Sequence, residues 1–264
     1  MKKVFSLAGL FLLLSAALFA QKKTITVMTY NIYHGEQAYE PGKSNLQEVA
    51  RVINTYKPDF VAIQEVDSLT GRSAELNDGK AQELIKKLGA LTGMEGFFGK
   101  AMDYDGGGYG EGILSRHPAT AVTHILPNPE GGEPRALLTL QAEMPGIGPM
   151  IFAGTHLCHQ FEENKIAQAN KILEILGNVN QPVLMGGDFN FRPDTEPYQI
   201  ITGSFGDAAL VKGDPKYTIS YEKPRARIDY IFFSPGRWKV LDVKVLHEGA
   251  SDHMPVLVKL KLKK

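Results

Sequence analysis

Hydrophobic and polar residues alternate along several short stretches of the chain, and this pattern predicts β-strands. Residues 24–32 place Ile25 and Val27 between threonines, which is the period-two pattern of a strand with one buried face. A second apolar run predicts a strand over 59–66. Further runs of the same kind lie at 111–116, 120–126, 135–143, 150–158, 182–190, 228–234, 238–246 and 254–262.

Three other stretches carry apolar residues at the spacing of an amphipathic helix. The first opens at Ser44, which stands three residues before Gln47 in a capping-box pattern, and it ends before Pro58. The others cover 80–90 and 164–177, and loops are expected at 106–108 and 128–134. Strands and helices do not alternate strictly. The pattern therefore favours an α/β fold in which two packed sheets are covered on the outside by helices.

The first twenty residues have the pattern of a secretory signal peptide. Lys2 and Lys3 precede an apolar run, and the small Ala20 is followed by a polar residue. The run is short for a membrane-spanning helix, which needs roughly 20 apolar residues. We expect cleavage after Ala20, export to the periplasm or the medium, no stable membrane insertion afterwards, and one domain over 21–264. An uncleaved N-terminal anchor is the alternative.

Charge and cysteine content narrow the classes of partner. The chain has 29 basic and 29 acidic residues, so removal of Lys2 and Lys3 with the signal leaves a net charge of −2. Proteins that grip long nucleic acid non-specifically are usually basic, so nucleic acid is not favoured as a partner. The one cysteine, Cys158, excludes an intramolecular disulfide and lies in an apolar run that favours a buried structural role over a catalytic thiol. We expect a monomer.

Polar residues gather at or just beyond the ends of the predicted strands. They are Asn31, Glu65, His156, Asp188, Asn190, Asp229, Asp252 and His253. Rigid strands would bring such side chains to one rim of the sheets. Oxygen ligands favour Mg²⁺, Mn²⁺ or Ca²⁺ over Zn²⁺, and nearby histidines suit phosphate contact or proton transfer. The sequence has no HExxH, paired CxxC, GxxxxGK[ST] or GxSxG motif.

Seven segments together carry a family resemblance. They are TYNIYHG, AIQEVD, GYGEGILSR, GTHL, GGDFN, RIDYIFFS and SDHMPV. Their order resembles that of the endonuclease/exonuclease/phosphatase superfamily, which includes DNase I-like nucleases, neutral sphingomyelinases, inositol-polyphosphate 5-phosphatases and deadenylases. The resemblance covers about residues 24 to 260. It implies a four-layer α/β sandwich, with two mostly antiparallel sheets packed face to face and helices outside, and a catalytic domain that hydrolyses phosphoesters with a metal ion.

The resemblance also implies roles for the metal and the water. Glu65 would be the principal Mg²⁺ ligand, helped by Asn31 and Asp252, with Mn²⁺ or Ca²⁺ as alternatives. Asp188 would take a proton from the attacking water, and Asn190 would orient the phosphate. Alternation along an extended segment places Asp188 and Asn190 on one side, whereas an Asx turn is the alternative. The alternative is that Glu65 is an exposed carboxylate at the end of a strand and does not bind a metal.

Two histidines complete the implied site. His253 resembles the catalytic histidine and Asp229 its orienting partner, with a buried structural Asp229 as the alternative. His156 resembles a second active-site histidine, with Glu111 hydrogen-bonded to it. Tyr109 would either contact phosphate or pack, and Arg135 would either neutralise a phosphate or form a surface ion pair. His34 and His159 are interpreted as loop residues beside the motifs.

The substrate remains open within this class. A nuclease should present basic loops with aromatic residues, but the segment 100–112 also carries Asp103, Asp105 and Glu111. A lipid hydrolase should present an apolar hairpin, but 127–134 is polar. We therefore favour a small or headgroup-type phosphoester as substrate. The alternatives are a secreted nuclease and, in another class, a non-catalytic binding module on the same fold, which would lack some site residues.

Overall fold

The computed structural model describes residues 24–213 and 215–263, which contain two six-stranded sheets. The first sheet has the order β11 (Trp238–Val245), β12 (Val256–Leu262), β1 (Thr24–Asn31), β2 (Phe60–Ser68), β4 (Gly107–Ser115), β3 (Glu95–Tyr104). The second has the order β5 (Ala119–Ile125), β6 (Ala136–Met144), β7 (Gly148–His156), β8 (Val183–Asp188), β10 (Asp229–Phe233), β9 (Gly206–Asp207). Only β1 with β2 and β7 with β8 pair in parallel among these strands, so both sheets are mostly antiparallel, as predicted.

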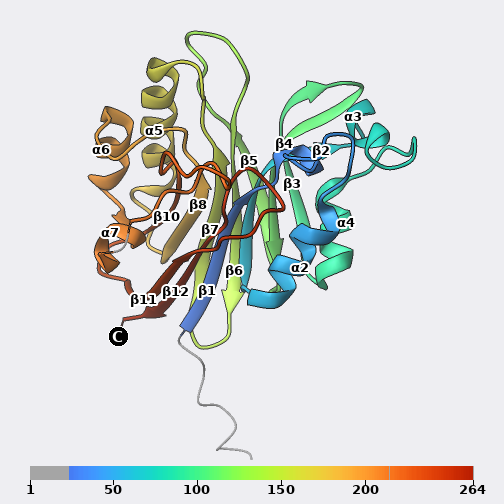
Figure 1. Cartoon of the computed structure of the whole chain (residues 1–264). Helices are drawn as coiled ribbons and strands as arrows, with labels where there is room; N and C mark the ends of the chain where they lie inside the picture. Colours follow the sequence, from blue (N-terminus) through green and yellow to red (C-terminus); the bar gives the residue numbers. More distant parts are fainter. Residues whose placement is uncertain (1–23, 214, 264) are drawn as a thin grey trace, which may run out of the picture.

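Helices cover the outer face of each sheet (Figure 1). In the first half lie the 3-10 helix η2 (Tyr33–Gly35), α2 (Leu46–Tyr56), α3 (Gly71–Glu75) and α4 (Leu84–Thr92). In the second half lie α5 (Glu162–Leu176), α6 (Glu196–Thr202) and α7 (Ala208–Lys212). Apolar residues of α2 and α4 share one buried cluster with the first sheet, and those of α5 and α6 share another with the second. This arrangement confirms the predicted four-layer sandwich.

A third apolar cluster fills the space between the two sheets. Ile25 and Val27 of β1 belong to it, whereas Met28 and Tyr30 face the helices, so β1 is buried on both faces as a central strand should be. The sheets approach closely at Gly186 of β8, where a Cβ would lie 3.1 Å from the Cβ of Thr29. The central strands are therefore held tightly against each other just below the rim where β1, β7 and β8 end.

The helix predictions hold in position but not in detail. The capping box predicted at Ser44 is wrong, because α2 begins at Leu46 and its N-cap residue is Asn45. The side chain of Asn45 instead donates to the carbonyl oxygens of Ile32, Glu36 and Ala250, which ties the helix start to two distant loops. The helix predicted at 80–90 starts four residues later, at Leu84. The short helices α3, α6 and α7 had no predicted counterpart.

The hairpin of β3 and β4 is the largest difference from the prediction. The expected loop at 106–108 is wrong at two of its three residues, because Gly107 and Gly108 lie in β4 and pair with Asp103 and Tyr104 of β3. Only the turn at Asp105 and Gly106 has positive φ. Glycines and charged residues interrupt the alternation in this segment, so the period-two signal of a strand is lost.

The predicted signal peptide lies in the N-terminal segment. The signal peptide at 1–20 lies outside the described residues, so it stays a prediction. Within 24–213 and 215–263, no helix is long and apolar enough to cross a membrane. Cys158 is buried, as expected, and its Sγ accepts a hydrogen bond from the amide of Phe161.

Candidate active site

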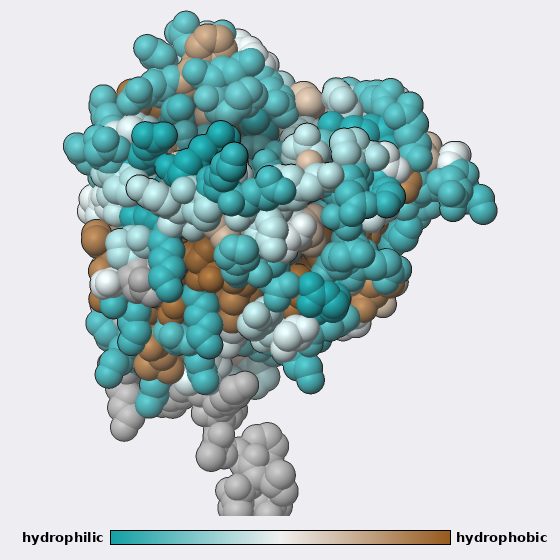
Figure 2. All heavy atoms as spheres, in the orientation of Figure 1, coloured by the Kyte–Doolittle hydropathy of each residue, from teal (hydrophilic) through white to brown (hydrophobic). Residues whose placement is uncertain are grey.

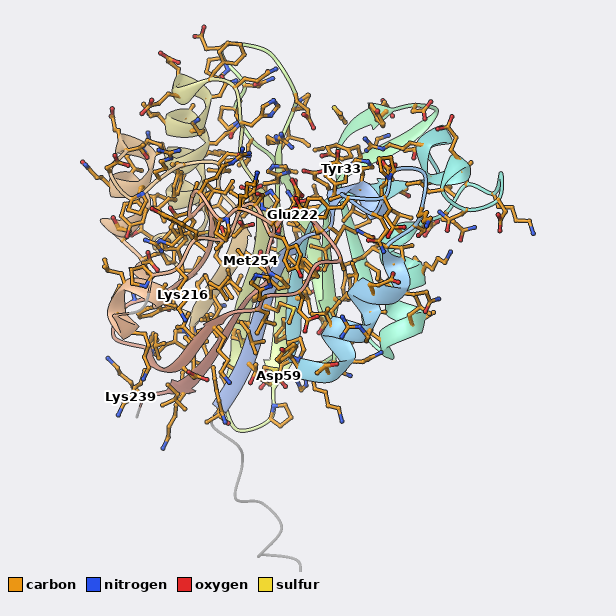
Figure 3. All side chains as sticks on the ribbon, in the orientation of Figure 1. Tyr33, Asp59, Lys216, Glu222, Lys239 and Met254 are labelled. Atoms are coloured by element: carbon orange, nitrogen blue, oxygen red, sulfur yellow. The ribbon has the colours of Figure 1, made fainter. Side chains whose placement is uncertain are left out.

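The strand register places three of the predicted site residues side by side at one rim. His156 and Asp188 are the last residues of the parallel strands β7 and β8, and they are register partners. Asp229 is the first residue of the antiparallel strand β10 and pairs with Asp188. Asn31 ends β1 at the same end of the molecule. Figure 3 shows Tyr33, just beyond β1, at this end and Asp59, just before β2, at the other.

Glu65 reaches the rim from a different local structure than expected. The prediction that Glu65 ends its strand is wrong, because β2 continues to Ser68. The register with β4 shifts between Ile63 and Val66, and Glu65 has a φ of 60°, which is the geometry of a β-bulge. The bulge leaves Glu65 only partly buried, and its carboxylate accepts a hydrogen bond from Asn31 on the neighbouring strand β1.

Asn31 links the carboxylates of the two sheets. Its Nδ2 donates to Glu65 Oε1 at 2.9 Å and to Asp188 Oδ2 at 3.1 Å, and its Oδ1 accepts from the amide of Tyr33. His34 Nδ1 lies 3.5 Å from Glu65 Oε2. Burial would raise the pKa of Glu65, but hydrogen bonds from His34 and from the amide of Asn31 favour the charged form and lower that pKa. Glu65 is therefore ionised, and His34 contacts the site although the sequence placed it outside.

Asp229 and His253 form the predicted pair. His253 Nδ1 lies 2.9 Å from Asp229 Oδ2, and its Nε2 lies 3.7 Å from Asp188 Oδ2. Burial opposes the charged ring, but the carboxylates of Asp229 and Asp188 raise the pKa of His253 to about 10. Burial and the charge of Asp229 raise the pKa of Asp188 to about 7. The three side chains offer ligand atoms within 4.8 Å of one another, a spacing that also suits a metal ion.

Asn190 reaches the site through a turn. The predicted extended alternation of Asp188 and Asn190 is wrong, because Asn190 has a φ of 49° and its amide donates to Asp188 Oδ1 in the Asx turn that was the alternative. The Asn190 side chain still reaches the site. Its Nδ2 lies 3.0 Å from both the carbonyl oxygen of Leu157 and His156 Nε2.

The surroundings of His156 differ from the expectation. The predicted Glu111–His156 hydrogen bond is wrong, because Arg135 Nη1 lies 3.0 Å from His156 Nδ1. Glu111 lies in the middle of β4, and its buried Oε2 has no hydrogen-bond partner among the described residues. Burial raises the pKa of Glu111 well above its usual range. Arg135 forms the ion pair considered for it, with Glu133, but Arg135 is only 2% exposed, so the pair does not lie on the surface as expected.

Asp252 and Glu65 are the two carboxylates predicted to hold a cation. Burial and the charge of Glu65 raise the pKa of Asp252, although His253 opposes them, so the charges of the two acids disfavour each other. Asp229 is already bonded to His253. Carboxylate and amide oxygens without thiolates suit a hard divalent cation, which would relieve the repulsion between Glu65 and Asp252. The residues at this rim therefore fit a metal of the expected kind.

A small pocket adjoins this rim through Tyr109. Arg72, Met102, Tyr104, Tyr109 and Glu133 line it. Tyr109 is buried and packs against Tyr104, while the guanidinium of Arg72 lies 4.6 Å from the centroid of the Tyr104 ring. Of the two roles considered for Tyr109, packing is the one these contacts display. Sequence reasoning missed Arg72, because nothing near it along the chain signals its bidentate contact with Asp67.

A family model described as the endonuclease/exonuclease/phosphatase family matches residues 28–253. The chain belongs to this family. YbhP of Escherichia coli strain K12 is 23% identical over 249 residues, covering 92% of this chain and 98% of YbhP. Membership makes the chain a hydrolase of the phosphoesterase class.

Solved structures of the family share the fold. An endonuclease/exonuclease/phosphatase from Beutenbergia cavernae has a TM-score of 0.74 at 25% identity, covering 91% of this chain and 72% of that one. The mannosyl-6-phosphatase Bt3783 of Bacteroides thetaiotaomicron has a TM-score of 0.70 at 18% identity, covering 91% of this chain and 100% of that one. These similarities agree with the four-layer architecture described above.

Proposed function

We propose that the protein hydrolyses a small or headgroup-type phosphoester with the help of a divalent cation, with Mg²⁺ favoured. The observation that carries the proposal is the position of Asp188. Its Oδ2 lies 3.1 Å from Asn31 Nδ2, 3.5 Å from His156 Nε2 and 3.7 Å from His253 Nε2. A carboxylate surrounded in this way can accept a proton from a water molecule and pass it on.

Glu65 and Asp252 would hold the cation, and Asn31 would orient Glu65. When bound, the cation polarises the phosphoryl oxygens and offsets the charge that builds as the fifth bond to phosphorus forms. Asn31 Oδ1 accepts from the Tyr33 amide and keeps a second lone pair, with which Asn31 would help to hold the cation or its waters. Its Nδ2 also fixes Asp188, so one amide aligns the cation-binding acid with the water-activating acid.

His253 and Asn190 would act on the phosphate. Asp229 fixes the ring of His253 through Nδ1, so a protonated Nε2 is free to donate to a phosphoryl oxygen. Asn190, held by the turn after Asp188, would present its amide to the same group. These residues need no rearrangement of the backbone to act together, which supports an enzyme over a binding module.

Charge supports a small substrate, and so does the polarity of the surface. Hydrophilic residues dominate the upper part of the face shown in Figure 2. Basic and acidic residues are equal in number over the whole chain, which gives long nucleic acid little electrostatic attraction. We also propose that the protein is exported, because the pattern of residues 1–20 is that of a signal peptide.

A substrate panel tests the proposal. The purified protein is assayed with Mg²⁺ and with EDTA on bis-p-nitrophenyl phosphate, inositol phosphates, mannose 6-phosphate, sphingomyelin, RNA and plasmid DNA. Hydrolysis of a small phosphoester that stops with EDTA and is absent in His253→Ala supports the proposal. Hydrolysis of plasmid DNA or RNA alone makes the protein a nuclease. A protein that binds Mg²⁺ and hydrolyses no member contradicts the proposed activity.

A further inference from the structure

Arg135 is a buried cation whose guanidinium contacts two histidines and one acid. Nη1 lies 3.0 Å from His156 Nδ1 and 3.2 Å from Glu133 Oε1. Nη2 lies 3.3 Å from Glu133 Oε2 and 3.2 Å from His159 Nδ1. Burying a charge is costly unless the charge is paired, and Glu133 provides the pairing. Stability alone does not require the contact with His156, which places the cation against an active-site ring.

Both ring nitrogens of His156 face nitrogen atoms. Nδ1 faces Arg135 Nη1 at 3.0 Å, and Nε2 faces Asn190 Nδ2 at 3.0 Å. A neutral imidazole carries one proton, so one of its nitrogens must donate and needs an acceptor opposite. Arginine has only donors and cannot supply one, whereas Asp188, whose Oδ2 lies 3.5 Å from Nε2, is an acceptor. An acceptor therefore lies on the Nε2 side of the ring and not on the Nδ1 side.

Resting on the proposed function, we infer that Arg135 is a positioning residue that fixes the tautomer of His156. Its guanidinium donates to Nδ1, so the ring proton resides on Nε2, the nitrogen that faces Asp188 and Asn190. His156 then acts as a neutral hydrogen-bond donor at the site.

The charges around His156 agree with a neutral ring. Burial and the charge of Arg135 lower the pKa of His156 well below its usual range. The other active-site histidine has the opposite surroundings, because His253 faces the carboxylates of Asp229 and Asp188. One histidine is thus held neutral and the other charged, a division of roles that active sites obtain from contrasting surroundings.

Glu111 does not supply the hydrogen bond to His156 that the sequence predicted. Its buried Oε2 and the buried Nε of Arg135 both have no hydrogen-bond partner among the described residues. Arg135 is therefore the side chain that contacts His156 Nδ1.

The test reads the tautomer directly. Nitrogen-15 NMR of the full-length protein, labelled at histidine and kept free of metal, distinguishes Nε2–H from Nδ1–H, and His156→Gln assigns the signal. We expect Nε2–H in the wild type and in Arg135→Lys, which keeps a donor-only cation. In Arg135→Gln, whose side chain can accept, we expect Nδ1–H to become populated. Arg227→Gln is the matched control, because Arg227 is also buried but pairs with Asp207 away from His156.

Steady-state kinetics of the Arg135 variants provides a second test, with the small phosphoester that the substrate panel identifies. Arg135→Gln should lower kcat by about tenfold to a hundredfold, the usual effect of losing a partner that orients an active-site histidine. KM should change less, and Arg135→Lys should restore most of the rate. Nδ1–H in the wild-type ring overturns the inference, and so does Nε2–H that persists in Arg135→Gln. The tautomer reading needs no turnover, so it stands even if the proposed hydrolysis fails.

Discussion

At the scale of single residues, the site works by setting the charge of each side chain through its neighbours. Asp229 and Asp188 hold His253 in the charged form, while Arg135 and burial hold His156 in the neutral form. Glu65 stays ionised because hydrogen bonds from His34 and Asn31 favour its charge. No single motif encodes these states, because each depends on a partner supplied by another strand or loop.

Replacement of Asp229 by asparagine tests the pairing with His253. The amide keeps the size of the side chain but removes the charge that supports the imidazolium and fixes Nδ1–H. We expect kcat to fall by about a hundredfold to ten-thousandfold while the fold is retained. Steady-state kinetics on the substrate identified by the panel, with circular dichroism as the folding check, gives the answer. An unchanged kcat would assign Asp229 a purely structural role.

At the scale of elements, irregular segments deliver the side chains that regular strands cannot. Glu65 stands on a bulge, Asn190 follows an Asx turn, and His253 lies in the segment before β12. The regular strands supply Asn31, His156 and Asp188 at their ends. A rigid frame with local departures from regularity is a common way to place functional groups.

A buried ion pair at the edge strand β9 contributes to the stability of the second sheet. Asp207 caps the start of α7 and also accepts from Arg227 at 2.6 Å and from the hydroxyl of Tyr198. We expect Asp207→Ala to lower the free energy of unfolding by about 3–5 kcal/mol, because it leaves Arg227 buried without its partner. Urea denaturation measures the change.

The control for this measurement is an ion pair on the surface. Glu174 is exposed and contacts Lys171 at 2.6 Å on the outside of α5. Since exposed pairs contribute little, Glu174→Ala should change the same free energy by less than about 1 kcal/mol. Equal losses in the two variants would mean that burial of the Asp207–Arg227 pair does not determine its contribution.

The sequence predicted the strands and their polar ends, but it did not predict the side-chain contacts between them. Apolar strands followed by Asn31, His156 and Asp188 predicted one polar rim, because each strand end is a local signal. The bulge at Glu65 left no such signal, since residues 59–66 were predicted as one continuous strand. The contact of Arg135 with His156 joins residues 21 positions apart, so only the pairing of β6 with β7 brings it about.

At the scale of the whole molecule, two similar halves meet at the site. Each sheet has one central parallel pair, and the two pairs pack face to face with β1 and β2 against β8 and β7. The acids proposed to bind the cation come from the first sheet and its loops, whereas the residues proposed to act on the water come mainly from the second. Asn31 bonds to one acid of each kind. The proposed activity therefore requires residues from both halves.

The Mg²⁺ dependence of Glu65→Gln shows whether Glu65 holds the cation needed for hydrolysis. The half-activating Mg²⁺ concentration is measured for the wild type, for Glu65→Gln and for Glu163→Gln, which changes an exposed acid on α5. We expect the half-activating concentration to increase at least about tenfold in Glu65→Gln, because a carboxylate ligand is lost, and to stay unchanged in Glu163→Gln. The same half-activating concentration in all three proteins would contradict a cation held by Glu65.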